Sequence, residues 1–140
     1  MWMLYALGSA TAAALVAIFG KVGLAGVDPT QATIVRGVVM AAILVLGGLV
    51  FGKLSGFSFA SFEGRDWIFI LLSAVAGAAS WLLYFVALQQ GPASAVAVID
   101  KLSVVLVIVL AAIFLNESLT LRSGLGIVLT VIGSLLIVFK

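Results

Sequence analysis

Long runs of apolar residues, separated by short polar stretches, make up most of this chain. Five such runs are predicted as helices, over residues 2–24, 32–51, 67–88, 93–115 and 121–139. Most contain the roughly 20 residues that an α-helix needs to cross about 30 Å of hydrocarbon. Strands are disfavoured because the runs are continuous instead of alternating, and an open sheet leaves its backbone unsatisfied in lipid. The pattern predicts an all-α, polytopic membrane protein with a bundle of five transmembrane helices.

Composition supports this interpretation and excludes several function classes. Of 140 residues, 65% are hydrophobic and 9% are charged, whereas a soluble domain carries about 25% charged residues. We therefore expect residues 1–140 to form a single integral membrane domain in the lipid bilayer of the cell (plasma or inner) membrane. The chain has no cysteine or histidine, which excludes disulfides and His- or Cys-based metal sites. With no phosphate loop or catalytic triad either, we expect no enzyme activity, no cofactor and no metal, and the net charge of +2 is too small to indicate nucleic acid binding.

Basic residues are balanced between the two sides of the membrane that the five spans predict. Lys53, Arg65 and Arg122 fall on the side of the N-terminus, and Lys21, Arg36 and Lys140 fall on the other. The excess of basic residues that normally sets orientation is therefore absent. One interpretation is that a weak signal, such as the terminal amine or a partner protein, sets a single orientation. The other is dual topology, in which chains insert both ways and pair as an antiparallel homodimer.

Asp100 and Lys101 are adjacent charges inside the predicted span 93–115, and their nearest charged neighbours along the chain are Asp66 and Glu117. Asp100 would lie about 12 Å into the helix. A charge at such depth costs about 2.5–3.5 kcal/mol on insertion scales. Adjacent helical side chains point about 100° apart, so we expect Asp100 and Lys101 to have separate partners on other helices.

Two further basic residues, Lys21 and Arg36, are expected in the same half of the membrane. We therefore predict a polar cluster of Lys21, Arg36, Asp100 and Lys101 that binds substrate or carries a proton. With all four ionised the cluster has a net charge of +2, which favours an anionic or zwitterionic solute. The alternative is structural, with an Asp100–Arg36 salt bridge between helices and with Lys21 and Arg36 reaching the interface.

Aromatic residues in the span 67–88 are candidates for the lining of a solute path. Trp81 and Tyr84 are suited to stacking on a substrate, although single aromatic residues in membrane helices also serve in packing or as interface anchors. Phe57, Phe59 and Phe62 in the linker 52–66 indicate either an amphipathic surface element or a loop with aromatic anchors.

The last predicted span carries small residues on one face. Gly126, Thr130 and Gly133 follow one another at helical spacing. Such a face allows close approach of two helices in lipid. We expect it to form the dimer interface, with packing inside the chain as the alternative. Just before this span, Glu117 is expected to stabilise the helix N-terminus.

Several motifs together resemble the EamA domain of the drug/metabolite transporter superfamily. They are "GKVGLAGVDPTQATIVRGVVMAAILVL", "YFVALQQGPAS", "LNESLT" and "GIVLTVIGSLLI". Lys21, Pro29 and Arg36 also fall where that family usually has Lys, Pro and Arg. The resemblance covers essentially the whole chain.

This resemblance implies half of a ten-helix transporter built from inverted repeats, because most such transporters carry two copies of the domain. A single copy implies that two antiparallel chains form a homodimer, which moves a small metabolite or drug-like solute by alternating access. The alternatives are a non-transporting regulatory or assembly subunit and one subunit of a lipid-linked flippase. Two places depart from the family: Ala13 and Ala14 stand where Trp-Gly is frequent, and Val104 stands where a proline is common. We therefore expect an unbroken helix over 93–115.

Overall fold

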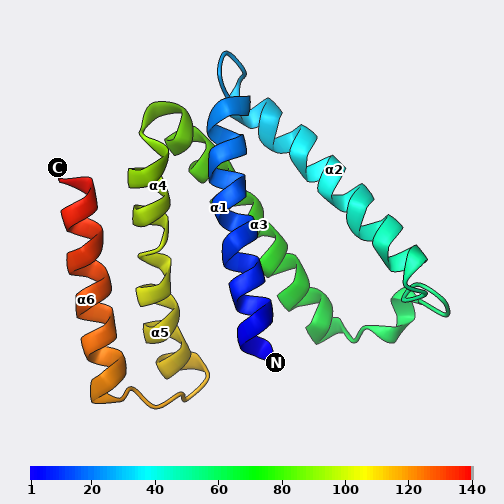
Figure 1. Cartoon of the computed structure of the whole chain (residues 1–140). Helices are drawn as coiled ribbons and strands as arrows, with labels where there is room; N and C mark the ends of the chain where they lie inside the picture. Colours follow the sequence, from blue (N-terminus) through cyan, green and yellow to red (C-terminus); the bar gives the residue numbers. More distant parts are fainter. Residues whose placement is uncertain (140) are drawn as a thin grey trace. The chain divides into compact units, whose positions relative to one another are not determined.

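A computed structural model describes residues 1–139 as helices joined by turns and one longer linker (Figure 1). The helices are α1 (Trp2–Gly23), α2 (Pro29–Val50), the 3₁₀-helix η1 (Phe59–Ser61), α3 (Gly64–Gln90), α4 (Ala93–Asp100), α5 (Ser103–Phe114) and α6 (Leu121–Val138). Five stretches are long and apolar enough to cross a membrane, with Ala93–Phe114 counted as one. The predicted all-α fold with five spans is confirmed. Lys140, which entered the charge balance, lies outside the described residues.

Local signals start α2 three residues before the predicted span. The side chain of Asp28 accepts a hydrogen bond of 3.0 Å from the backbone N–H of Gln31, which satisfies one of the free donors at a helix N-terminus. Pro29 occupies the first turn, where its missing N–H has no helical partner to lose. The helix therefore begins in the polar turn and not at the first apolar residue.

The span over 93–115 is not one continuous helix, so the prediction of an unbroken helix was wrong. α4 ends at Asp100 and α5 begins at Ser103. Between them Leu102 N–H donates to Ile99 O at 2.9 Å, and Val104 N–H donates to Lys101 O at 3.0 Å. These bonds reach back three residues, as in a 3₁₀-helix. The prediction relied on the absence of proline, but the backbone tightens here without one.

Thr120 and Ser123 form the N-terminal cap of α6. The backbone N–H of Ser123 donates to Thr120 Oγ1 at 3.2 Å, and the N–H of Thr120 donates to Ser123 Oγ at 2.9 Å. This reciprocal pair is a capping box. The side chain that caps the helix is therefore Thr120 and not Glu117, whose stabilising effect through the helix dipole stays a prediction.

The chain divides into two compact units. The first contains residues 1–22 and the residues from 90 onward, and the second contains residues 23–89. In the first unit α4 packs against α6, and Ser134 of α6 is buried. The hydroxyl of Ser134 donates to Thr130 O at 2.7 Å, so its polarity is satisfied within its own helix.

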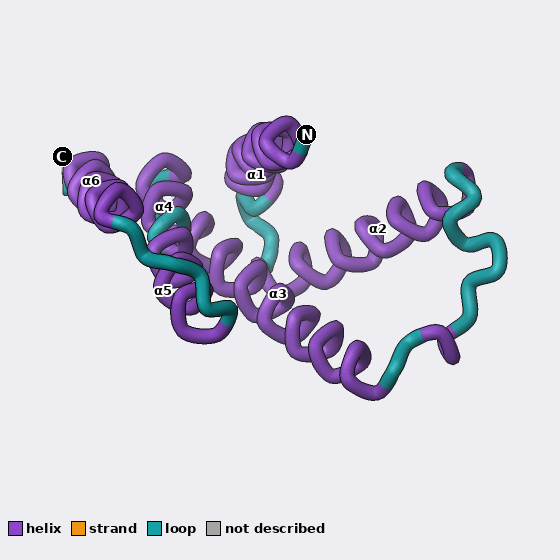
Figure 2. The backbone as a smooth tube through the Cα atoms, turned by 90° about the horizontal axis from the view of Figure 1, so that it is seen from below, coloured by secondary structure: helices purple, strands orange, loops and turns teal. Residues whose placement is uncertain are grey.

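In the second unit, α2 and α3 meet near the Pro29 end of α2 and separate toward the linker (Figures 1 and 2). Phe85 and Leu88 of α3 are buried at the meeting end, and so is Leu24 in the turn before α2. The linker consists of turns and the three-residue helix η1. It is therefore a loop that carries aromatic residues, and not an extended amphipathic helix.

Most apolar side chains of the five spans are exposed in the isolated chain. A soluble protein of this size would be expected to bury such residues in a core. Lipid tails are as apolar as leucine, so a membrane protein has no comparable need to cover them. The exposure is therefore what an integral membrane protein is expected to show.

Candidate functional site

Arg36 of α2 lies over two aromatic rings of α3. Its guanidinium carbon is 4.6 Å from the centre of the Trp81 ring and 5.1 Å from the centre of the Phe85 ring. Trp81 and Phe85 are four residues apart, and this spacing places both rings on one face of α3. A cation over an aromatic face is attracted by the ring quadrupole, by about 0.5–2 kcal/mol. We call these three residues the arginine cradle.

Two neighbouring contacts hold the helix end that carries the arginine cradle. Gln89 Nε2 donates to Val27 O at 3.0 Å, which ties the end of α3 to the turn before α2. The ring of Tyr84 lies 6.4 Å from that of Phe85. Phe85 itself is only 4% exposed. The rings under Arg36 are therefore held in place by packing and by a polar tie between the helix ends.

Of the two aromatic candidates from the sequence, Trp81 contacts Arg36 directly, while Tyr84 neighbours Phe85. Phe85 was missed. The usable signal was its spacing of four residues from Trp81, because residues at i and i+4 share a helix face. A phenylalanine in an apolar run has no polar atom, so its sequence position alone indicates only ordinary packing.

Lys21 lies at the turn between α3 and α4. Its ammonium donates to the backbone O of Gly91 at 2.9 Å. Gly91 directly follows the end of α3, where carbonyl groups lack helical partners. A lysine at this place is favourable for the helix C-terminus. This contact fits the structural alternative for Lys21, while its role toward a solute stays a prediction.

Asp100 and Lys101 pair with each other, which corrects the expectation that each needs a separate partner. Lys101 Nζ lies 3.6 Å from Asp100 Oδ2, and the two side chains are 57% and 39% exposed, respectively. The expectation assumed a continuous helix. Because α4 ends at Asp100 and Lys101 is in the turn, the two side chains reach one another. An ion pair this exposed contributes at most about 1 kcal/mol in water.

The four predicted charges are divided between the two compact units. Arg36 belongs to the second unit, and Lys21, Asp100 and Lys101 belong to the first. The cluster of four and the Arg36–Asp100 salt bridge therefore stay predictions.

The small-residue face of α6 has room for side chains at its two glycines, although Thr130 and Gly133 are partly buried. A Cβ atom built on Gly126 or Gly133 would meet no described atom within 4 Å. Thr130 Oγ1 donates to Gly126 O at 2.8 Å, so its hydroxyl is satisfied within the helix. Its role as a dimer interface stays a prediction.

The described residues contain no group of three acidic side chains that could hold a metal ion. Acidic residues are few and are spread along the chain. The recognition chemistry that the described residues present in the second unit is that of a guanidinium over two aromatic rings.

Comparison with known proteins identifies the family. The chain matches the EamA-like transporter family over residues 1–139. It is 41% identical over 136 residues to a Sinorhizobium sp. protein named "Uncharacterized transporter in cobO 3'region", and the match covers 97% of this chain and 95% of that protein. It is 33% identical over 135 residues to "Uncharacterized transporter YvbV" of Bacillus subtilis (strain 168), covering 92% of this chain and 42% of that protein. No solved structure shows a significant match. By its sequence over essentially the whole chain and by its five apolar spans, the protein is a member of the EamA-like transporter family of integral membrane proteins.

Proposed function

We propose that this chain is half of a small secondary transporter in the cell membrane, which moves a small metabolite or drug-like solute by alternating access. Family membership and the names of the two relatives support the general class, a membrane transporter. The arginine cradle is the observation that carries the more specific proposal, that the solute bears an anionic group.

Arg36 lies seven residues after Pro29, about 10 Å along α2. A charge inside a span costs about 2.5–3.5 kcal/mol or more, and the two rings offset only part of this cost. Within the described second unit, no carboxylate lies within 4 Å of the guanidinium. A solute anion is well suited to compensate the remaining charge.

The shape of the cradle favours a planar anion. Aromatic rings cover guanidinium faces, whereas the five N–H donors of an arginine lie along its edge. That edge matches a carboxylate or phosphate, which accepts two parallel hydrogen bonds. Trp81 and Phe85 would at the same time offer an apolar surface to the rest of the solute.

The antiparallel homodimer is part of this proposal. The balance of three basic residues on each predicted side supports insertion in both orientations. The Sinorhizobium relative is matched over 95% of its length, whereas YvbV is matched over only 42% of its length. This difference supports a division of the family into shorter chains, which would pair, and longer chains with room for a second domain.

Flux measurements in proteoliposomes test the proposal. A panel of carboxylate solutes should be transported, and their neutral amides should be transported at least about tenfold more slowly. Arg36→Gln should abolish the preference for carboxylates, and Arg36→Lys should restore part of it because lysine keeps the charge without the planar edge. Arg122→Gln is the matched control and should leave flux unchanged. Unchanged flux and preference in Arg36→Gln would contradict the role of the cradle.

The Asp100–Lys101 pair is tested in the same assay. We expect flux to be lost in Asp100→Asn and in Lys101→Ala, because ionisable groups inside a membrane are costly and are usually kept for function. Unchanged flux in both variants would make the pair structural. No solute flux by the wild type, together with lipid translocation, would favour the flippase alternative. The absence of both activities would favour a non-transporting subunit.

A further inference from the structure

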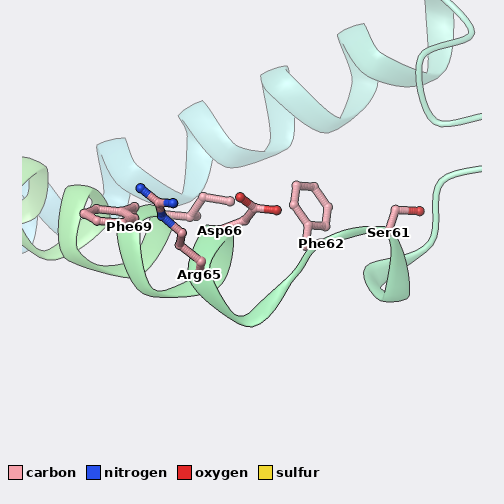
Figure 3. Close-up of a pocket in the computed structure, with 6 residues that line it drawn as sticks. Ser61, Phe62, Arg65, Asp66 and Phe69 are labelled. Carbon is pink, nitrogen blue, oxygen red and sulfur yellow. The ribbon is translucent and has the colours of Figure 1, made fainter.

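A pocket of about 500 Å³ lies where the linker meets the first turns of α3 (Figure 3). It is lined by Ser61, Phe62, Arg65, Asp66, Phe69 and Ile70. These residues lie at the end of α3 opposite to the arginine cradle, since Arg65 and Asp66 are in its first turn and Trp81 and Phe85 are in its later turns. The pocket is therefore separate from the proposed transport site.

The pocket carries one positive and one negative side chain. The Arg65 guanidinium carbon lies 5.8 Å from the centre of the Phe69 ring, and Figure 3 shows the Asp66 carboxylate directed toward Phe62. One oxygen of Asp66 accepts the Glu63 N–H at 3.0 Å, which leaves the other oxygen for a ligand. Among the described residues of the second unit, neither Arg65 nor Asp66 forms an ion pair within 4 Å. A ligand with both an anionic and a cationic group would match these charges.

The length of α3 places this pocket at the membrane surface. The helix has 27 residues, so it is about 40 Å long and exceeds the roughly 30 Å of hydrocarbon. Its first turn therefore extends into the headgroup region. The aromatic residues beside the pocket agree with this depth, because the Phe62 and Phe59 rings lie 5.5 and 6.0 Å from the ring of Trp67, and aromatic residues collect at the membrane interface.

The lining of the pocket changes from polar to apolar along α3, from the membrane surface toward the hydrocarbon. A bound lipid has its polar headgroup and its acyl chains in the same order. All the polar lining residues, Ser61, Arg65 and Asp66, are at the linker end beside the ring of Phe62, and Phe69 and Ile70 lie one turn further toward the apolar span. The side chains of Phe69 and Ile70 are well exposed, at 60% and 45%. A ligand with its polar group at the surface and its apolar part pointing into the membrane would follow this gradient.

We propose that the pocket binds the headgroup of a zwitterionic phospholipid with a primary ammonium, such as phosphatidylethanolamine. Arg65 binds the phosphate, Asp66 accepts hydrogen bonds from the ammonium, and the acyl chains run along Phe69 and Ile70. A purely anionic headgroup leaves Asp66 without a cation. A choline headgroup has no N–H to donate to the carboxylate. The chemistry of the pocket therefore selects phosphatidylethanolamine over phosphatidylglycerol and phosphatidylcholine.

Native mass spectrometry of the full chain, with each of these three lipids added at equal concentration, tests the assignment. The wild type should bind phosphatidylethanolamine preferentially. Arg65→Gln should weaken this binding about tenfold, because it removes a charge-assisted contact to phosphate. Asp66→Asn should remove the preference over phosphatidylcholine. Arg122→Gln, in the first turn of α6, is the control and should bind like the wild type.

A second experiment on the unaltered chain keeps the test independent of how the variants fold. A phosphatidylethanolamine analogue with a photoreactive group on its acyl chain should label peptides that contain residues 62–70. Equal labelling by a phosphatidylglycerol analogue, or labelling outside this segment only, would overturn the assignment. A full preference for phosphatidylethanolamine in both Arg65→Gln and Asp66→Asn would overturn it as well. Both readouts measure lipid binding and do not depend on transport.

Discussion

At the residue scale, the main physical problem is how single charges are accommodated inside apolar spans. Arg36 is accommodated by the rings of Trp81 and Phe85. Asp100 and Lys101 are accommodated by each other, at a place where the helix is interrupted. Aromatic faces compensate a cation while leaving its hydrogen-bonding edge available, whereas an ion pair uses the charges of both partners. This difference is why the proposed anion recognition involves Arg36.

Replacing Trp81 by Leu should destabilise the protein by about 0.5–2 kcal/mol, because the cation–π contact with Arg36 is lost. Thermal unfolding in detergent measures this change as a lower Tm. Trp2→Leu is the control, since Trp2 is 72% exposed and has no such contact among the described residues.

The same substitution made in an Arg36→Gln background should cost clearly less, because the cation is already absent. Equal losses of stability in the two backgrounds would show that Trp81 acts through packing alone.

At the element scale, the starts of two helices can be predicted from local sequence, whereas the break in the fourth span cannot. Asp28 and the Thr120–Ser123 pair start α2 and α6 by hydrogen bonds within three residues, and such local signals can be read from sequence. The break between α4 and α5 has no proline or glycine to mark it. A tightened helical turn of this kind often marks a hinge.

We expect the backbone amides of residues 101–106 to exchange with deuterium faster than those of residues 108–113. Hydrogen bonds in the 3₁₀ turn have poorer geometry and open more readily than those inside α5. Hydrogen–deuterium exchange in nanodiscs, followed by mass spectrometry, measures both segments in one sample. Uniform protection across residues 101–113 would show that the interruption does not weaken the span.

Removing the cap of α6 gives a second test at this scale. Thr120→Ala should destabilise the protein by about 1 kcal/mol, because the Ser123 N–H loses its partner. Thr120→Asn should be nearly neutral, since asparagine is also a good cap. The Tm values of the two variants measure the contrast. Similar decreases of Tm in Thr120→Ala and Thr120→Asn would show that the effect comes from packing and not from capping.

At the scale of the whole molecule, the main question is how the chain associates with a second copy of itself. The exposed apolar surface and the glycines of α6 bear on this question. A Cβ atom on Gly126 or Gly133 would meet no described atom within 4 Å, while the buried Ser134 belongs to the same helix, which packs on α4. Small residues favour close helix contact in lipid. The prediction that a second copy of the chain contacts the face around Gly126 and Gly133 can therefore be tested by filling these positions.

Gly133→Leu and Gly126→Leu should weaken the homodimer by obstructing close approach of two helices. Cross-linking in membranes measures the dimer fraction, and Gly8→Leu in α1 is the control because its surroundings are equally open. Reporters fused to the chain should at the same time detect both orientations. An unchanged dimer fraction would show that the interface lies elsewhere. A single orientation of the reporters would contradict the antiparallel homodimer.

The sequence by itself determined the membrane location, the five spans and the EamA resemblance. These properties depend on hydrophobic length and on local motifs, which remain the same in any arrangement of the helices. Only the tertiary structure decided that Phe85 joins Trp81 under Arg36, that Lys21 reaches Gly91, and that Asp100 and Lys101 pair beside a break. Contacts such as these join residues far apart in the chain or depend on a local backbone change. These contacts cannot be predicted from the sequence pattern, because the same type of apolar residue can face either lipid or a guanidinium.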